Sequence, residues 1–210
     1  MNILITGTSS GIGEALAIHF SNQKDTPVTW IERVTRKSDW NIIPFDLSHT
    51  HDLEMIFPLS VPYDVIILNA WVGYFNAFEE IKSENNTETI HTNLLSNIEL
   101  LRLLKKHNNI ADEATIITLW SQASKHFYVW WAAYQASKWW LRGFIGSLRK
   151  EWKQYRFYLI HPQIVATRFF RNTKDGVIPS HLPRTKKEDI TEIIDNILHW
   201  VKKYDWEIDC

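Results

Sequence analysis

Residues 2–20 read NILITGTSSGIGEALAIHF, and this stretch decides the fold class of the chain. Its first five residues form an apolar run that predicts a short buried strand. After a glycine-containing turn, apolar residues recur at every fourth position, as they do on one face of a helix. These residues are Ile12, Leu16 and Phe20. A strand followed by a turn and a helix is the first unit expected of an α/β protein.

Three glycines lie in the turn, in a Gly-x-x-x-Gly-x-Gly pattern formed by Gly7, Gly11 and Gly13. Glycines let the backbone approach a pyrophosphate closely, and the N–H groups and dipole at the start of a helix favour its negative charge. Because the strand and the helix that this chemistry requires are both present, the pattern favours phosphate binding over a plain tight turn.

The rest of the chain alternates strands with helices. Further strands are expected at residues 27–31, 41–45, 64–69, 114–121 and 156–161, with a short edge strand at 206–210. Helices are expected at residues 51–57, 89–107, from Tyr134 to about 153, and at 188–203, with a loop at 168–183. This alternation predicts a doubly wound parallel sheet covered by helices on both faces, a three-layer α/β/α architecture in a single domain over residues 1–210.

The composition is that of an ordinary globular domain, because 45% of the 210 residues are hydrophobic and 22% are charged. The net charge of −1 favours neither nucleic acid nor an anionic membrane as a partner. No apolar run approaches the ~18 residues of a membrane span, and nothing resembles a signal peptide. The single cysteine, Cys210, cannot form an intrachain disulfide, so a reducing, cytoplasmic location is expected. The histidines lack carboxylate or thiol partners at ligand spacing, so no metal is expected.

A second stretch, SQASKHFYVWWAAYQASK at residues 121–138, carries the candidate chemistry. Tyr134 and Lys138 stand four residues apart and would share one face of a helix. A nearby ammonium favours the phenolate and lowers a tyrosine pKa that is ordinarily ~10. Such a tyrosine can donate or accept a proton near neutral pH. Ser121 ends an apolar strand, where its hydroxyl would hydrogen-bond a substrate oxygen at the carboxyl edge of the sheet.

These motifs together resemble the short-chain dehydrogenase/reductase family over nearly the whole chain. Residues 6–13, TGTSSGIG, are similar to the cofactor turn TGxxxGIG of that family, and Asn69-Ala70 begins its NAG motif. Asp46-Leu47 stands where the family places an acidic residue against the adenine. The residues that match its catalytic tetrad are Asn93, Ser121, Tyr134 and Lys138, and Thr167 matches the threonine of its PGxxxT motif.

The resemblance implies a Rossmann fold and an NAD(P)-dependent oxidoreductase acting on a small-molecule carbonyl or alcohol. Tyr134 would be the general acid or base, and Lys138 would lower its pKa and bind the nicotinamide ribose. Ser121 would hold the substrate oxygen, and Asn93 a water on the proton path. The residues expected at the cofactor are Gly7, Ser9, Ser10, Gly11, Ile12, Gly13, Glu32, Arg33, Asp46, Leu47, Asn69, Ala70, Trp71, Tyr134, Lys138, Pro162, Ile164, Val165 and Thr167.

Two positions depart from the family pattern. Trp71 replaces the last glycine of the NAG motif, and Gln163 replaces the glycine that follows Pro162. Glycine often serves a close approach of the backbone to a ligand. A tryptophan at residue 71 must therefore turn its ring away from the cofactor or lie along it.

Two questions stay open at the level of sequence. A non-catalytic NAD(P)-binding sensor would use the same fold and glycine turn, although the intact tetrad favours an enzyme. Aromatic residues crowd the segments around the expected cleft, where they either fill the core or line a substrate pocket, and a pocket would favour an apolar or aromatic substrate. They are Trp71, Tyr74, Phe75, Trp120, Phe127, Tyr128, Trp130, Trp131, Phe169 and Phe170.

Cofactor choice depends on the end of the second strand. Glu32 follows Gly13 by nineteen residues, close to the ~20-residue offset at which a carboxylate binds the adenosine ribose of NAD. Arg33 follows directly and could instead bind the 2′-phosphate of NADP, and Arg36 and Lys37 lie within reach too. Because successive strand residues point to opposite faces, Glu32 and Arg33 cannot both face the ribose as long as the strand continues through them. Ser9 and Ser10 also stand where a basic residue would hold the extra phosphate, so NAD(H) is favoured over NADP(H).

A homodimer is also expected. The helix after Asn93 and the helix after Tyr134 carry apolar residues on more than one side, which is usual for helices buried on two fronts. The residues concerned are Leu94, Leu95, Leu100 and Leu103 on the first helix, and Trp139, Trp140 and Phe144 on the second.

Overall fold

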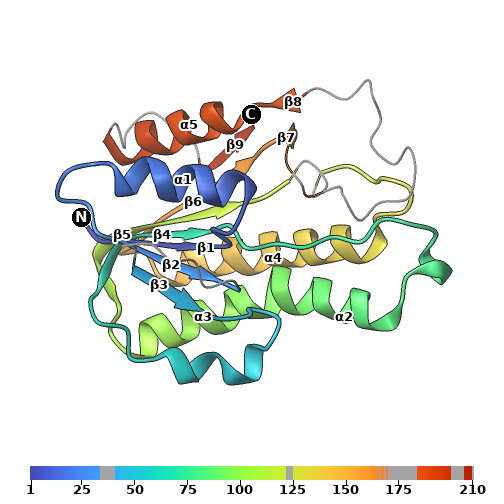
Figure 1. Ribbon diagram of the computed structural model, residues 1–210, viewed down its shortest axis with the longest axis horizontal. Coiled ribbons are helices and arrows are strands. Elements are labelled where there is room, and N and C mark those ends of the chain that lie inside the picture. Colours follow the sequence, from blue (N-terminus) through green and yellow to red (C-terminus); the bar gives the residue numbers. More distant parts are fainter. Residues whose placement is uncertain are drawn as a thin grey trace.

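The computed structural model describes residues 1–33, 41–121, 125–165, 167, 169, 184–199 and 206–209. Seven parallel strands form one sheet in the order β3-β2-β1-β4-β5-β6-β9 (Figure 1). The strands are β1 (Ile3–Thr6), β2 (Val28–Glu32), β3 (Asn41–Pro44), β4 (Tyr63–Leu68), β5 (Ile110–Leu119), β6 (Arg156–His161) and β9 (Glu207–Asp209). A separate pair is formed by β7 (Ile164–Val165) and β8 (Arg184–Thr185). The predicted doubly wound parallel sheet is confirmed.

Helices cover both faces of the sheet, as predicted (Figure 1). One face carries α1 (Gly11–Ser21) and α5 (Lys187–His199), and the other carries α3 (Ser96–Lys106) and α4 (Ala132–Glu151). Helix α2 (Ser83–Ile90) packs beside α4 and continues through a π-helical turn, η3 (His91–Leu95), into α3. Two short 3-10 helices are η1 (Thr50–Ile56) and η2 (Phe78–Glu80).

The central strands are buried because their side chains are apolar on both faces. All four residues of β1 and all five of β2 are buried. On one side they pack against Leu16 of α1 and Ile194 of α5. On the other side the sheet packs against Leu101 of α3 and Ile145 of α4. The two apolar clusters hold the three layers together.

Two elements differ in extent from their prediction. The helix expected from residue 89 begins at Ser83, where the polar sequence SENNTETI has no apolar stripe to mark it. Strand β5 begins at Ile110 rather than residue 114, and its early residues Asp112 and Glu113 are not buried. The helix extension is polar and the strand extension is interrupted by Asp112 and Glu113, so periodicity did not indicate either. The expected loop at 168–183, except Phe169, lies outside the described residues, as do Cys210 and the end of the last predicted helix.

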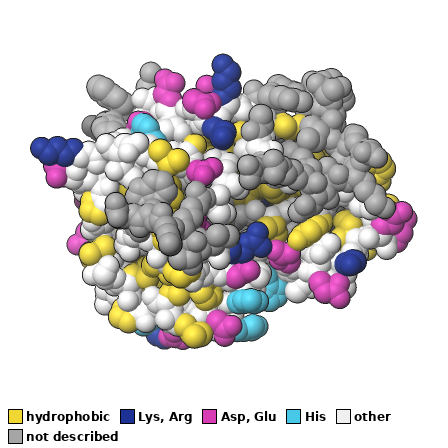
Figure 2. All heavy atoms as spheres, in the orientation of Figure 1, with side chains coloured by type: hydrophobic (Ala, Val, Ile, Leu, Met, Phe, Trp, Pro, Cys, Tyr) yellow, Lys and Arg dark blue, Asp and Glu magenta, His cyan; other side chains and the backbone are white. Residues whose placement is uncertain are grey.

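The surface carries no dominant charge on the face shown in Figure 2, where basic and acidic side chains are interspersed. No described helix is both long enough and apolar enough to cross a bilayer. Among the described residues, histidines, cysteines and carboxylates form no group that could hold a metal ion. The strand order reverses between β1 and β4. The carboxyl ends of the strands on either side of such a reversal form the place where α/β proteins bind ligands.

Candidate active site

A cleft opens at this carboxyl edge, outside β1, β2 and β4. Its described lining includes most of the residues predicted at the cofactor: Gly7, Ser9, Ser10, Gly11, Ile12, Glu32, Arg33, Asp46, Leu47, Asn69, Ala70, Trp71 and Thr167. Predicted residues that are not among the described lining of this cleft are Gly13, Tyr134, Lys138, Pro162, Ile164 and Val165.

The turn between β1 and α1 lies tightly against the end of β4. Gly7 has a left-handed backbone with φ 70°, and a Cβ at this position would lie 2.6 Å from the Cα of Ala70. A Cβ on Gly13 would lie 2.2 Å from Nδ2 of Asn69. That amide donates hydrogen bonds of 3.0 Å to the carbonyl oxygens of Thr6 and Gly7. The close approach leaves room only for glycine at both positions.

Helix α1 begins at the cleft without a side-chain cap. Ser10 is the N-cap residue, has an extended backbone, and makes no capping hydrogen bond with its side chain. Ser9, Ser10, Gly11 and Ile12 all line the cleft. The first N–H groups of a helix have no intrahelical acceptor, and together with the helix dipole they attract a phosphate. These residues therefore fit the pyrophosphate of a dinucleotide.

Glu32 and Arg33 both line the cleft but in different environments. Glu32 is 2% exposed, and its Oε2 accepts a hydrogen bond of 2.9 Å from the hydroxyl of Thr8. Arg33 is exposed, and its Nη1 lies 3.4 Å from a carboxylate oxygen of Glu88. Both residues line the cleft because β2 ends at Glu32, so the alternation of strand side chains does not extend to Arg33. Which of the two faces the ribose stays a prediction.

Glu88 is a cleft residue that no sequence motif indicates. Its second carboxylate oxygen accepts a hydrogen bond of 2.6 Å from the hydroxyl of Tyr74. Burial, together with the hydrogen bond and charge of Glu88, raises the pKa of Tyr74 to about 12. Glu88 lies on the polar helix α2, whose approach to the cleft depends on the tertiary packing alone.

Three of the predicted catalytic residues meet where β5 ends and α4 begins. Tyr134 and Lys138 are one helical turn apart on α4, and they are 1% and 2% exposed. The phenol of Tyr134 is hydrogen-bonded to the side chain of Ser121. The ammonium of Lys138 donates a hydrogen bond of 3.4 Å to the carbonyl oxygen of Leu119. The shared helix face predicted from the spacing of Tyr134 and Lys138 is thus observed.

The predicted electrostatic effect of Lys138 on Tyr134 is wrong in this arrangement. Burial raises the pKa of the Tyr134 phenol above its ordinary value, and the hydrogen bond with Ser121 lowers it only in part. Burial also lowers the pKa of Lys138 to about 7. The reason is that loss of water disfavours both charged forms, the phenolate and the ammonium.

Asn93 lies buried in the π-helical turn η3, and its side chain holds the loop that follows β4. Its Oδ1 accepts a hydrogen bond of 2.8 Å from the N–H of Val72, and its Nδ2 donates one of 2.8 Å to the carbonyl of Val72. Nδ2 also lies 3.0 Å from Oγ of Ser137 on α4. The backbone carbonyl of Asn93 accepts a hydrogen bond of 2.9 Å from Asn97. That Asn93 holds a water stays a prediction.

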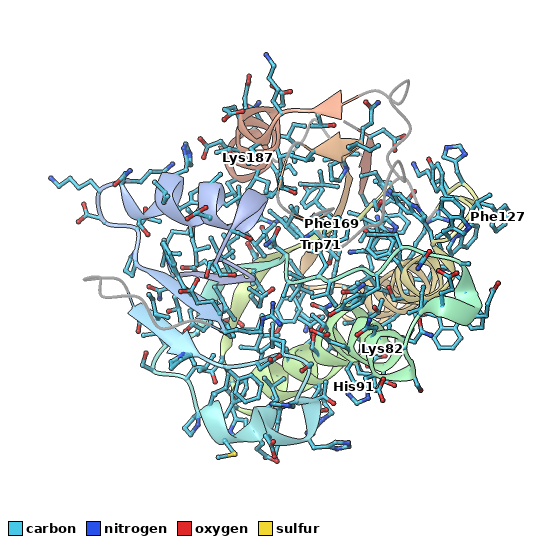
Figure 3. All side chains as sticks on the ribbon, turned by 45° about the vertical axis from the view of Figure 1, so that its right-hand side comes forward. Trp71, Lys82, His91, Phe127, Phe169 and Lys187 are labelled. Atoms are coloured by element: carbon cyan, nitrogen blue, oxygen red, sulfur yellow. The ribbon has the colours of Figure 1, made fainter. Side chains whose placement is uncertain are left out.

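Aromatic rings surround Tyr134. The ring centroids of Phe75, Trp131 and Phe169 lie 5.5, 5.7 and 5.6 Å from that of Tyr134. The ring centroid of Trp71 lies 6.2 Å from that of Tyr134 and 4.2 Å from that of Phe169. Trp71 and Phe169 lie side by side in Figure 3. We call Trp71, Phe75, Tyr128, Trp131 and Phe169 the aromatic cluster.

The other aromatic residues considered from the sequence lie elsewhere. Trp120 is fully buried in the core between the sheet and α4. Phe127 and Trp130 are 88% and 46% exposed, and Phe127 lies at the edge of the molecule in Figure 3. Tyr74 lines the cleft beside Glu88. Phe170 is outside the described residues.

In the segment after β6, the described residues that line the cleft are Thr167 and Phe169. Ile164 and Val165 form β7 and pair with β8. The N–H of Gln163 donates a hydrogen bond of 3.0 Å to Oγ1 of Thr185, so this position serves the β7–β8 pair. Thr167 lines the cleft, and its methyl group would lie 3.3 Å from a Cβ on Gly11.

Residues 1–177 match the sequence profile of the family described as short chain dehydrogenase. Benzil reductase ((S)-benzoin forming) of Bacillus cereus is 27% identical over 210 aligned residues, covering 91% of this chain and 82% of that protein.

Two solved structures share the fold. A short chain dehydrogenase family protein from Francisella tularensis superposes with a TM-score of 0.83 at 23% identity, covering 99% of this chain and 96% of that one. 4-Hydroxyisoleucine dehydrogenase complexed with NADH has a TM-score of 0.78 at 20% identity, covering 100% of this chain and 96% of that one. Since the family profile covers most of the chain, an enzyme rather than a sensor is confirmed. The chain belongs to the short-chain dehydrogenase/reductase family of NAD(P)-dependent oxidoreductases, which act on CH–OH or C=O groups.

Proposed function

We propose that this enzyme uses NAD(H) to reduce an apolar or aromatic carbonyl compound, with Tyr134 as the proton donor. The observation that carries the proposal is the aromatic cluster around the hydrogen-bonded pair of Tyr134 and Ser121. Two of its rings, Trp71 and Phe169, line the cleft. Apolar and aromatic side chains in ligand pockets bind the apolar part of a substrate, and a few polar groups orient it. Benzil, the substrate in the name of the Bacillus cereus relative, is an aromatic diketone and fits this description.

Tyr134 and Ser121 have separate roles in the proposed reaction. The bound dinucleotide supplies the hydride. The hydroxyl of Tyr134 donates a proton to the carbonyl oxygen, and Ser121 holds the same oxygen and stabilises the negative charge that develops on it. A phenol with the ordinary tyrosine pKa of ~10 is protonated at neutral pH, and burial raises the pKa of Tyr134 further, so the proton that the reduction needs is present on this hydroxyl. In the reverse reaction Tyr134 would accept the proton.

The charges of the cleft favour NAD(H) over NADP(H). Its described lining contains the carboxylates of Glu32, Asp46 and Glu88, and Arg33 as the described cation. Arg33 already pairs with Glu88 at 3.4 Å. A 2′-phosphate would meet this excess of negative charge, and like charges repel more strongly in a partly buried site than in water. The ribose hydroxyls of NAD can instead donate hydrogen bonds to a carboxylate.

A substrate panel tests the proposal. Benzil, an apolar monoketone, an aldose and a 2-keto acid would be assayed with NADH and with NADPH. We expect turnover of the diketone or the apolar ketone with NADH at least tenfold above that of the sugar and the acid. Preference for the sugar or the keto acid would contradict the aromatic assignment, and tenfold tighter binding of NADPH than of NADH would contradict the assignment of the cofactor.

Tyr134→Phe tests the role of the phenol. The substitution keeps the ring in the aromatic cluster and removes the proton donor, so turnover should fall by at least the ~10²-fold typical of a lost general acid, while NADH binding is retained. Tyr128→Phe is the matched control, because it removes a phenol from the same cluster at a residue given no proton-transfer role. A near wild-type rate in Tyr134→Phe, or an equal loss in Tyr128→Phe, would show that the assignment is wrong.

We also propose that the enzyme is a homodimer formed through the outer face of α4. Trp139 and Trp140 are 39% and 64% exposed there. Phe127 stacks on Trp139, with ring centroids 5.9 Å apart and planes within 4°. Large exposed apolar side chains that gather in one place are typical of an interaction surface.

The apolar residues of the first helix, which also led us to expect a dimer, do not form part of this surface. Leu94, Leu100 and Leu103 are buried in the core of their own chain, and Leu95 packs partly buried against it. These side chains leave no apolar face on α3 for a second subunit. The apolar residues of α3 face more than one direction because η1 packs against this helix as well as the core of the sheet.

A further inference from the structure

Trp71 follows β4 at the position where the family motif has a glycine, and its indole touches the candidate catalytic residues. The Nζ of Lys138 lies 4.9 Å from the centroid of the indole. The ring centroids of Tyr134 and Phe169 lie 6.2 and 4.2 Å from the indole. Figure 3 shows Trp71 and Phe169 next to each other near the centre of the molecule. A single side chain therefore contacts the lysine, the tyrosine and the neighbouring ring at once.

The indole separates the cleft from Lys138. The described lining of the cleft includes Trp71 and Phe169 but neither Lys138 nor Tyr134. Lys138 is 2% exposed and Tyr134 is 1% exposed. Of the described residues that line the cleft, Trp71 is the one whose ring lies over the ammonium.

The backbone on both sides of Trp71 is held in place, so a movement of the indole belongs to the side chain. The N–H and carbonyl of Val72 each form a hydrogen bond of 2.8 Å with the amide of Asn93. On the other side, the N–H of Ala70 donates a hydrogen bond of 3.0 Å to Oγ1 of Thr6. A change of the side-chain rotamer at Trp71 breaks none of these bonds.

The contacts that Lys138 makes in this arrangement are weak. Its hydrogen bond to Leu119 is 3.4 Å long. The ring faces of Trp71 and Tyr134, at 4.9 and 5.6 Å, are its described cation–π contacts. An ammonium has three donors, and hydroxyl oxygens accept hydrogen bonds from it better than ring faces do. A ribose can therefore compete with the indole for Lys138.

We propose that the Trp71 indole is a cover over Lys138 that the nicotinamide ribose of the dinucleotide must displace. Trp71 then weakens the binding of the whole dinucleotide and leaves the binding of its adenosine half unchanged. The inference rests on the proposed function, because it requires a dinucleotide in the cleft. It makes Trp71 a residue that selects ligands able to bind Lys138 strongly enough to move the ring.

Calorimetric titration with NADH and with ADP tests the inference without measuring activity. ADP reaches only the adenosine half of the site and reports whether the glycine turn is intact. We expect Trp71→Gly to bind NADH about tenfold more tightly than the wild type, a factor that corresponds to ~1.4 kcal/mol. This agrees in size with the loss of one cation–π contact and one aromatic pair. ADP should bind both proteins within twofold. Trp140→Phe, on the exposed face of α4, should change neither affinity.

Each result supports or overturns the inference. Weaker NADH binding with unchanged ADP binding would mean that the indole holds the nicotinamide end, and equal NADH binding would mean that it covers nothing the ligand needs; both overturn it. If Trp71→Gly loses ADP binding, its fold is disturbed, and Trp71→Phe replaces it in the test. We expect Trp71→Phe to bind NADH about threefold more tightly than the wild type and ADP equally well, and equal or weaker NADH binding would overturn the inference. A wild-type protein that binds neither NADH nor NADPH would instead refute the proposed function.

Discussion

Replacing Lys138 by methionine should stabilise the folded protein at neutral pH. Lys138 is 2% exposed, and burial lowers its pKa from 10.5 to about 7. In the unfolded chain the same lysine keeps its proton up to about pH 10.5. Between these two values the unfolded state binds more protons than the folded state, so stability rises with pH across this window.

The size of the effect follows from the pKa difference. Each pH unit of difference corresponds to ~1.36 kcal/mol, so the buried lysine lowers the free energy of unfolding by about 4 kcal/mol at pH 7. This penalty falls to about 2 kcal/mol at pH 9 and vanishes above pH 10.5. Methionine is unbranched like lysine, one atom shorter, and uncharged. Any packing change that it introduces does not depend on pH.

Urea unfolding of the two proteins at pH 7, 8 and 9 measures the difference. We expect Lys138→Met to be more stable at pH 7 and its advantage to shrink by about 2 kcal/mol between pH 7 and pH 9. Lys150→Met is the matched control, because Lys150 is exposed on the same helix and its substitution should change stability by less than ~0.5 kcal/mol at every pH. An advantage that stays constant with pH would refute the reasoning, since it would show that Lys138 is not held with a depressed pKa.

The remaining predictions concern the glycines, the assembly and the cofactor. Gly13→Ala should destabilise the protein by ~1–3 kcal/mol in urea unfolding, because its Cβ would lie 2.2 Å from neighbouring atoms, whereas Gly146→Ala, with its nearest neighbour at 3.8 Å, should stabilise α4 by ~0.5–1 kcal/mol. Light scattering at micromolar concentration should give twice the 24.8 kDa of one chain, and Trp140→Glu should give the single-chain mass; a wild-type monomer would refute the dimer. Glu88→Gln removes one cleft carboxylate and releases Arg33, so the ratio of the Kd for NADPH to that for NADH should fall several-fold, and an unchanged ratio would contradict the electrostatic argument.

Some features of the site were predictable from local sequence because their physics is local. The spacing of Tyr134 and Lys138 sets a shared helix face wherever the helix forms. Likewise, a strand, a glycine turn and a helix define the phosphate-binding turn within residues 2–20. The alternation of strands with helices was sufficient to predict the parallel sheet. The strands of such a sheet are covered by helices on both faces, and they are therefore continuous apolar runs that can be recognised in the sequence.

Other features depended on contacts between residues distant in the chain. The pKa values of Tyr134 and Lys138 move opposite to the effect expected from their spacing, because burial disfavours both charged forms. That burial depends on neighbours such as Trp71 and Leu119, which come from other parts of the chain. Glu88 reaches Arg33 across 55 residues of sequence, from a helix with no apolar stripe.

The sequence by itself thus determined the fold class, the family and many, but not all, of the residues that line the cleft at the carboxyl edge of the sheet. Tertiary structure alone decided which of the predicted site residues line the cleft and which, such as Tyr134 and Lys138, are buried. The reason is that periodicity and motifs record what each segment needs locally, whereas exposure, dielectric environment and access are properties of the assembled layers, to which every segment contributes.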